Sequence, residues 1–336
     1  MTASWPGLRV YYHDEPDALI LDAVRPVLAD APDAFFVRHW FGGPHLRLCF
    51  PGPEFAWDGP AAVGALRAWL LEHPSRTRLD PARLRHDQDL LTAREAVAEP
   101  VRPPAPDNSV ELVAYDRHLN ELGGVEAAAV VEEFYAGTNP AVYAGLEAIR
   151  SGGSRTAIAL DLMWAVVHAH GAGVVHPFVS LRTHAEVFLA AAYDPVGCRE
   201  LFAGQFAARR RALVERLDGL VGGAVWPADV AIVLDRLTAA RPRVAELTGD
   251  GRVNLWDTTP PPRLRRTGFL DQLESGQVLA MLGASPEFAI WRVTINLLYL
   301  HLTRLGISPF QRALLAYLAA ATLEECLGVR ATDVIW

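Results

Sequence analysis

The sequence contains no lysine, so the 31 residues counted as lysine plus arginine are all arginine, against 39 aspartates and glutamates. Schiff-base catalysis, attachment of pyridoxal phosphate and the phosphate-binding P-loop each require a lysine, and these classes are therefore excluded. The net charge of -8 disfavours nucleic acid as a partner.

Cysteine is scarce as well, with only Cys49, Cys198 and Cys326 and no CxxC pair. Neither a disulfide framework nor a zinc finger is predicted. The sequence also lacks a GxGxxG between a strand and a helix, an HExxH and a GxSxG. We therefore expect no metal and no cofactor.

Long apolar runs are missing too, because no window holds about 18 uninterrupted apolar residues. The N-terminus lacks the basic-then-apolar order of a signal peptide. Hydrophobic residues make up 51% and charged residues 21% of the chain, which is typical of a folded globular protein. We expect a cytoplasmic protein with no membrane partner.

The N-terminal part carries strand signals around one turn. Residues 8–13 favour a strand, 14–28 a helix, and FFVRHWFGGPHLRLCF (35–50) two strands around a Gly-Gly-Pro turn. In the second of these strands, Leu46 and Leu48 alternate with His45, Arg47 and Cys49. One face is thus apolar and the other polar, which fits either a plain hairpin or one wall of an active site.

Beyond a proline-rich connection at 97–109, the spacing becomes helical. Helices are predicted there at 125–135, 154–170, 182–192, 198–217, 227–247, 270–281, 287–306 and 309–327, and one more precedes the connection at 61–73. Strands followed by helices indicate an α+β fold. We expect a sheet-containing region at 1–110 packed on a mainly helical region at 111–336, together forming one integrated domain.

Two helical stretches carry candidate chemistry. In 287–306, the polar residues Arg292, Asn296, Tyr299 and Thr303 recur every three or four positions, which gives either a polar pocket or a core tyrosine with a satisfied hydroxyl. In LRTHAE (181–186), His184 lies near a helix start, where it could act as acid or base or cap a turn.

The hairpin motif resembles the signature FFxRYwxxGPHLRLRF of the C-terminal, thiopeptide-type bacteriocin biosynthesis domain of lantibiotic dehydratases. Residues 115–139, 180–189 and 296–306 resemble three further blocks of that family in the same order. The resemblance spans almost the whole chain and implies the elimination-domain fold. In a dehydratase, that domain removes glutamate from glutamylated serine or threonine.

The family's elimination residues are only partly present. Arg47 keeps the first arginine of the hairpin, whereas Cys49 replaces the second. Glu121 stands where the family has an arginine before its Gly-Gly, and Tyr299 replaces the catalytic histidine. A thiol and a carboxylate cannot hold the leaving glutamate as arginines do, so glutamate elimination is disfavoured.

The same family includes stand-alone pyridine synthases of thiopeptide maturation, and the resemblance therefore implies this activity. Such enzymes join two dehydroalanines of a modified precursor peptide by a formal aza-[4+2] cycloaddition, then lose water and expel the leader peptide as an amide. The reaction needs no metal or redox cofactor. The precursor peptide is the expected partner, together with other maturation enzymes of the pathway.

Site roles follow from the helix face and the matched blocks. We expect Tyr299 to hydrogen-bond or protonate the reacting amide, with Arg292 and Asn296 orienting backbone carbonyls. His184 is the candidate proton shuttle for dehydration, and Ser285 contributes at the start of the helix. The residues expected to bind substrate are Arg47, His45, Trp291, Glu121, His301 and Arg304, where His301 and Arg304 are the histidine and arginine that survive from the last family block.

Negative charge on the leader would suit arginines, and two groups are candidates: Arg263, Arg265 and Arg266, or the triplet at 209–211. Two alternatives to the synthase remain open. One is a glutamate-eliminating lyase of a split dehydratase that has re-sited its residues. The other is a non-catalytic scaffold that holds the precursor peptide for partner enzymes.

Overall fold

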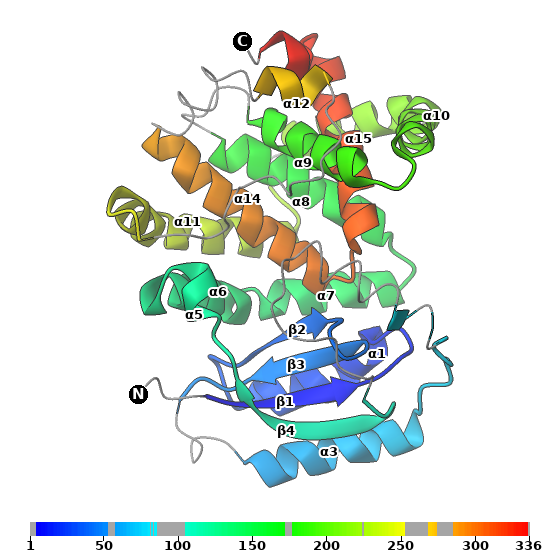
Figure 1. The fold of residues 1–336 in the computed structure, drawn as a ribbon, viewed down its shortest axis with the longest axis vertical. Helices are drawn as coiled ribbons and strands as arrows, with labels where there is room; N and C mark the ends of the chain where they lie inside the picture. The colour runs from blue at the N-terminus through cyan, green and yellow to red at the C-terminus, as the bar shows by residue number, and fades with distance from the viewer. Residues whose placement is uncertain are drawn as a thin grey trace. The chain divides into compact units, whose positions relative to one another are not determined.

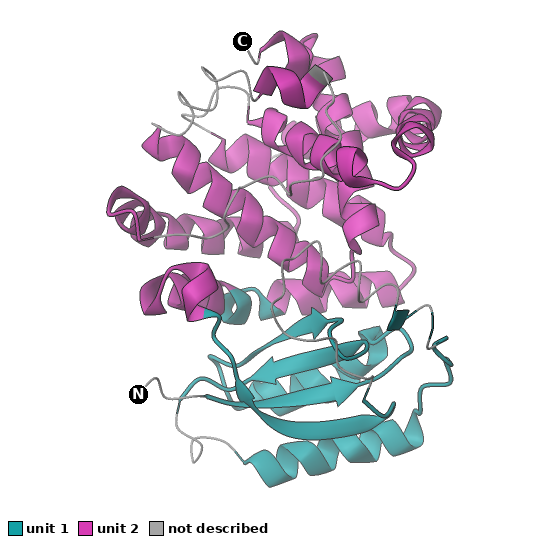
Figure 2. Ribbon diagram, viewed as in Figure 1, with its two compact units in different colours: residues 1–118, 135–139 teal, residues 119–134, 140–336 magenta. Residues whose placement is uncertain are grey.

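The computed structural model describes residues 5–52, 58–80, 82, 84–85, 105–171, 177–223, 225–252, 268–273 and 285–334. The chain divides into two compact units (Figure 2). Unit 1 comprises Met1–His118 and Tyr135–Asn139, and unit 2 comprises Leu119–Phe134 and Pro140–Trp336. The expected α+β class is confirmed, while the expectation that both parts form one integrated domain stays a prediction.

Unit 1 is built on a four-stranded sheet with the strand order β2-β3-β1-β4 (Figure 1). All of its pairings are antiparallel. The predicted hairpin is confirmed, since β2 and β3 pair with Val37 opposite Arg47. The strands are β1 Trp5–Tyr11, β2 Phe35–His39, β3 His45–Cys49 and β4 Ser109–Tyr115.

Two glycines allow the chain to reverse between β2 and β3. Gly42 has a φ of 79° and Gly43 a φ of 104°, a region that residues with a Cβ seldom adopt. The amide of Gly43 donates to the carbonyl of Trp40 at 3.0 Å. The Gly-Gly pair of the hairpin motif is thus required by the geometry of the turn.

The sheet has one apolar face, as the alternation in β3 predicts. Leu8 and Val10 of β1 and Leu46 and Leu48 of β3 are each at most 1% exposed. Helix α3 packs against β4 and η1. The helical segments of unit 1 are α1 Asp17–Leu19, the π-helical turn η1 Ile20–Val24, α2 Arg25–Ala29 and α3 Gly59–Glu72.

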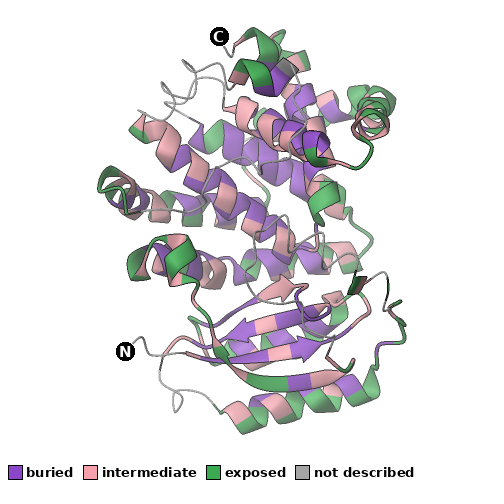
Figure 3. Cartoon of the chain, viewed as in Figure 1, coloured by how far each residue is buried: buried purple, intermediate pink, exposed green. Residues whose placement is uncertain are grey.

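Unit 2 is helical throughout its described residues. Helix α8 lies at its centre, with every residue from Ala159 to Val167 buried (Figure 3), and packs against α10, α11, α14 and α15. A helix that is buried all round anchors a bundle. The elements, apart from the end of α6 and the first residue of α7, which belong to unit 1, are α5 Leu119–Leu122, α6 Val125–Gly137, α7 Asn139–Arg150, α8 Arg155–His170, α9 Phe178–Ala191, α10 Pro195–Val221, α11 Ala228–Gly249, α12 Gly268–Leu273, α14 Pro286–Arg304, α15 Pro309–Leu327 and η3 Ala331–Asp333.

Capping residues fix where the last two long helices begin. The Ser285 hydroxyl accepts the amide of Phe288 at 3.3 Å at the start of α14. At the start of α15, Ser308 and Gln311 form a reciprocal capping box. These caps set the register of the residues that α14 and α15 present inside the bundle.

The sequence analysis missed strand β4, helix α7 and the short helical elements α5 and η3. Strand β4 follows a proline-rich stretch and lies at the edge of the sheet next to β1, so its loop-like surroundings in the sequence concealed it. Helix α7 was also missed, although NPAVYAGLEAIR has helical spacing. The predicted helix at 270–281 is described only to Leu273, and no helix in the described ranges is long and apolar enough to cross a membrane.

Gly7→Ala is expected to destabilise unit 1 by about 1–3 kcal/mol. A Cβ at this position would lie 2.9 Å from the carbonyl oxygen of Leu48 in the neighbouring strand, and backbone cannot move aside as a side chain can. The matched control is Gly64→Ala in α3, where an added Cβ meets nothing within 4 Å. In that control, the free energy of unfolding should rise by about 0.5–1 kcal/mol, because alanine is favoured over glycine inside a helix. Urea unfolding measures the free energy of unfolding of both variants. A Gly7→Ala variant as stable as the wild type would contradict the pairing of β1 with β3.

Candidate active site

The polar face predicted on α14 is present, and its residues differ in burial. Arg292 and Asn296 are half-buried, and neither makes a hydrogen bond or ion pair with any residue in the described ranges. Tyr299, one turn further, is 7% exposed. The Thr303 hydroxyl donates to the Tyr299 carbonyl at 3.0 Å.

The Tyr299 hydroxyl is buried and has no hydrogen-bond partner in the described part of the chain. Burial raises the pKa of this phenol well above its usual value, and the nearby Arg312 charge opposes that shift only in part. An unsatisfied buried hydroxyl costs free energy, about 1–3 kcal/mol, so such a group is expected to serve a ligand or water. Tyr299 is thus a neutral phenol that can donate a hydrogen bond.

His184 reaches this phenol from helix α9. The two ring centroids lie 4.3 Å apart with an interplanar angle of 38°. The structure thus brings together the two residues that the sequence analysis assigned to proton chemistry, although 115 positions separate them in the chain (299 − 184).

Arg312 of α15 completes the cluster and was missed by the sequence analysis. Its Nε lies 3.3 Å from His184 Nε2, and one terminal nitrogen donates to the Thr303 hydroxyl at 3.2 Å. Its guanidinium carbon lies 5.3 Å from the centre of the Tyr299 ring. The available signal was a cation near the start of a helix that is otherwise largely apolar, which spacing alone cannot relate to α14.

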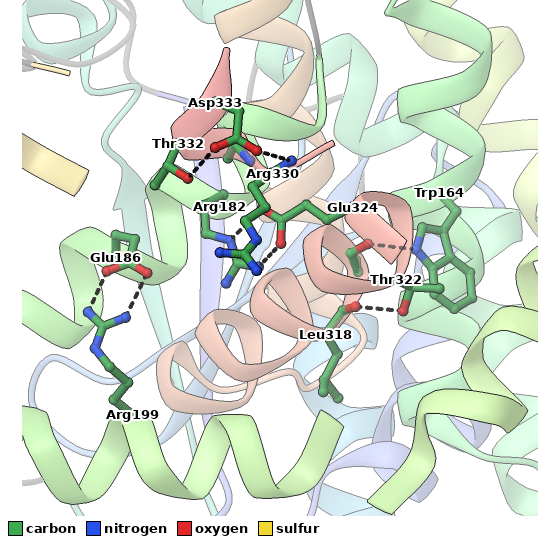
Figure 4. A network of polar contacts seen from close by, with 12 residues as sticks. Trp164, Arg182, Glu186, Arg199, Leu318, Thr322, Glu324, Arg330, Thr332 and Asp333 are labelled. Atoms are coloured by element: carbon green, nitrogen blue, oxygen red, sulfur yellow. Dashed lines mark hydrogen bonds and ion pairs between the residues drawn. The ribbon is translucent and has the colours of Figure 1, made fainter. Parts of the chain in front are cut away.

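Arg182 and Glu186 of LRTHAE line a cavity of about 930 Å³ in unit 2. Arg182 pairs with Glu324 of α15, its Nε lying 3.1 Å from the carboxylate, and Arg199 of α10 donates to Glu186 at 2.9 and 2.5 Å (Figure 4). The Arg182 guanidinium also lies over the Tyr317 ring at 4.4 Å. These ion pairs join α9 to its neighbours. Arg182 and Glu186 of the motif therefore stabilise the helix packing, whereas His184 belongs to the cluster around Tyr299.

Several expected site residues lie within the helix packing. Ser285 acts as the cap of α14, and Trp291, 1% exposed, donates its indole N–H to the Ser180 hydroxyl at 2.8 Å. His301 and Arg304 are each 1% exposed. Burial, aided by the Arg304 charge, lowers the pKa of His301 to about 3. The substrate contacts expected of these residues stay predictions.

The polar face of the sheet, in unit 1, collects cations and imidazoles. Arg47 of β3 stands opposite Arg9 of β1, and its Nε donates to His45 Nε2 at 3.3 Å. Burial, then the Arg9 charge, lowers the pKa of Arg47 to about 10. Burial also lowers the pKa of His45 to about 4 and that of His39 to about 2. The predicted polar face of the hairpin is therefore present, with neutral imidazoles beside two guanidiniums, and its role as a wall of the active site stays a prediction.

The remaining expectations concern charged groups. Glu121 is exposed on α5. Of the triplet at 209–211, Arg210 pairs with Glu325 and Arg211 with Glu215. Arg263, Arg265 and Arg266 lie outside the described residues. No group of three or more histidine, cysteine or acidic side chains within the described ranges is placed to hold a metal ion.

Comparisons with known proteins place these features in a family. The family described as "Lantibiotic biosynthesis dehydratase C-term" matches residues 5–323. Among solved structures, the pyridine synthase TbtD from thiomuracin biosynthesis is 34% identical over 97% of this chain and 99% of that chain, with a TM-score of 0.79. No curated protein matches the chain.

Two further structures are similar in fold alone. TsrL is 22% identical over 99% of this chain and 98% of that chain, with a TM-score of 0.74. The tRNA-dependent lantibiotic dehydratase MibB from Microbispora sp. 107891 is 18% identical over 97% of this chain but 28% of that chain, with a TM-score of 0.50. The fold thus occurs both as a stand-alone chain and within a much longer protein.

His301 is expected to make the protein less stable in acid. Its folded-state pKa, about 3, lies below the value of about 6.5 in an unfolded chain. The unfolded state therefore takes up a proton first, and stability falls as pH drops below about 6.5. In His301→Gln, the fall in the free energy of unfolding should be shallower by up to about 1.4 kcal/mol per pH unit.

Urea unfolding at a series of pH values measures this slope, with His73→Gln, which changes an exposed histidine, as the control. Equal slopes in wild type and His301→Gln would show that His301 is not held neutral by burial.

Proposed function

The chain belongs to the family of lantibiotic biosynthesis dehydratase C-terminal domains, and we propose that it is a pyridine synthase of thiopeptide antibiotic biosynthesis. The observation that carries the proposal is the 34% identity to the solved pyridine synthase TbtD, which extends over 97% of this chain and 99% of that one. An enzyme acting on a modified precursor peptide fits this relationship. We place its action in the cytoplasm.

The proposed reaction joins two dehydroalanines. The alkene and the iminol form of the amide at one dehydroalanine add across the alkene of the other, which forms two carbon–carbon bonds and a six-membered ring. Loss of water and of the leader peptide as its carboxamide then leaves an aromatic pyridine that closes the macrocycle. The atoms balance without an oxidant or a reductant, so no redox cofactor enters the proposal.

Tyr299 is assigned to the amide that must become the iminol. Its phenol is buried, neutral and without a partner in the described residues, so it can donate to the amide oxygen. Such a donor draws electron density onto the oxygen and makes the amide N–H more acidic, so that the nitrogen gives up its proton to water as the oxygen takes one up. Arg292 and Asn296, half-buried on the same helix, are assigned to orienting peptide carbonyls.

His184, beside Tyr299, is assigned to the dehydration step, in which the departing oxygen needs a proton or a hydrogen-bond donor. Ser285, whose hydroxyl caps α14, is assigned a contact at the start of that helix. The substrate-binding residues are Arg47, His45, Trp291, Glu121, His301 and Arg304. The leader is assigned to Arg263, Arg265 and Arg266.

Two competing functions predict other products. A glutamate-eliminating lyase is favoured by the retention of Arg47, His301 and Arg304, but Cys49 and Glu121 stand where that reaction uses arginines. A scaffold would bind the precursor without changing its mass.

The deciding experiment incubates the protein with a leader-bearing peptide that contains azoles and two dehydroalanines, and separately with a glutamylated peptide. Pyridine absorbance together with a macrocycle mass supports the synthase. Loss of glutamate supports the lyase, and binding with no change in mass supports the scaffold.

Tyr299→Phe is expected to lower kcat by about 100-fold or more, since a positioned proton donor contributes about that factor. The peptide dissociation constant should change little, because the ring remains. Tyr317→Phe is the matched control: this tyrosine lies in the same unit, on the cavity beside Arg182. Wild-type turnover by Tyr299→Phe in a single-turnover assay would refute the assignment.

A further inference from the structure

Arg312 reaches both residues assigned to the chemistry. One guanidinium group contacts His184 of α9, the hydroxyl of Thr303 and, through its face, the ring of Tyr299 of α14. The side chain comes from α15, so three helices meet at this one cation. No family block quoted above contains it.

The direction of the contact with His184 is fixed by chemistry. Arginine carries five N–H donors and no acceptor, and it stays protonated in proteins. At 3.3 Å from the guanidinium Nε, His184 Nε2 must therefore accept with its lone pair. A neutral imidazole that accepts at one nitrogen carries its proton on the other. The ring of His184 is thus an Nδ1–H tautomer whenever this contact is made.

We propose that Arg312 is a positioning residue that holds His184 as a neutral Nδ1–H hydrogen-bond donor beside Tyr299. This inference rests on the proposed function only for its catalytic consequence. His184 then acts on the departing oxygen of the dehydration step as a donor, and it does not shuttle a proton through Nε2. Tyr299 and His184 together become two neutral donors, which suits a reaction in which amide oxygens gain electron density.

The charges around His184 favour the same state. A proton added at Nε2 would point at the Arg312 cation, and both groups would then be positive and donors only. Tyr299, a further titratable group in contact with His184, is a neutral phenol. The charged residues on the neighbouring turns of α9 are already engaged in ion pairs: Arg182 with Glu324, and Glu186 with Arg199.

Nitrogen NMR of protein carrying ¹⁵N-histidine tests the proposal without any substrate. The His184 signals, assigned by their loss in His184→Gln, should show the Nδ1–H tautomer and should not titrate between about pH 8 and about pH 5. In Arg312→Gln, Nε2 should gain a proton within that range. Thr303→Val removes one hydrogen-bond partner of Arg312 but keeps the charge, so the titration of His184 Nε2 should lie between those of wild type and Arg312→Gln. This variant also tests the proposal if Arg312→Gln does not fold.

Arg216→Gln is the matched control, because Arg216 pairs with Asp161 in the same unit. Its His184 signals should equal those of wild type. An Nε2–H tautomer in wild type, or the same titration of His184 with and without Arg312, would overturn the proposal.

Kinetics separates this proposal from the proposed function. Arg312→Gln should lower kcat by about tenfold to 100-fold with little change in KM. The double variant with His184→Gln should be no slower than His184→Gln alone, since the two residues act as one unit. Additive losses would contradict positioning through His184. If the wild type forms no pyridine, the proposed function fails while the NMR result still decides the role of Arg312.

Discussion

The contact of the Arg312 guanidinium with His184 and Thr303 is the interaction on which the candidate site depends. It ties α9, α14 and α15 together at one point and faces the ring of Tyr299. Because arginine only donates, the groups around it must accept or remain neutral. In our proposal, the same cation sets both the geometry of the cluster and the tautomer of His184.

The wider electrostatics follows one pattern. The ionic groups of α9 are satisfied within unit 2, where Arg182 and Glu186 each face an opposite charge. Buried histidines are held neutral, with the pKa of His301 lowered to about 3 and that of His45 to about 4. Hydrogen bonds among buried groups are electrostatically stronger than those in water. Such surroundings suit a cyclisation whose demands are positioning and polarisation rather than the binding of a charged leaving group.

Sequence patterns predicted those parts of the structure that local spacing controls. The hairpin, its polar face with His45 and Arg47, and the face of α14 with Tyr299 follow from periods of two residues and of three to four residues. The pairing of His184 with Tyr299 could only be expected from the resemblance, since spacing does not relate separate helices. Arg312 was missed for the same reason.

Other differences have equally local causes. Strand β4 was not predicted because the segment before it is rich in proline. The family resemblance gives no information on burial, so only the structure shows that Trp291, His301 and Arg304 lie deep in the helix packing. A side chain that is 1% exposed can meet a peptide only if its surroundings move. For these three residues, a substrate contact is a stronger demand than for Tyr299, which is 7% exposed.

The fate of one nitrogen tests the central claim most directly. In the proposed reaction, the dehydroalanine that carries the leader loses its nitrogen to the departing carboxamide, whereas the nitrogen of the other dehydroalanine enters the ring. A peptide with ¹⁵N in the leader-bearing dehydroalanine should therefore give a labelled leader amide and an unlabelled pyridine in the mass spectrum. Label retained in the macrocycle, or a leader released as a carboxylic acid, would contradict the account.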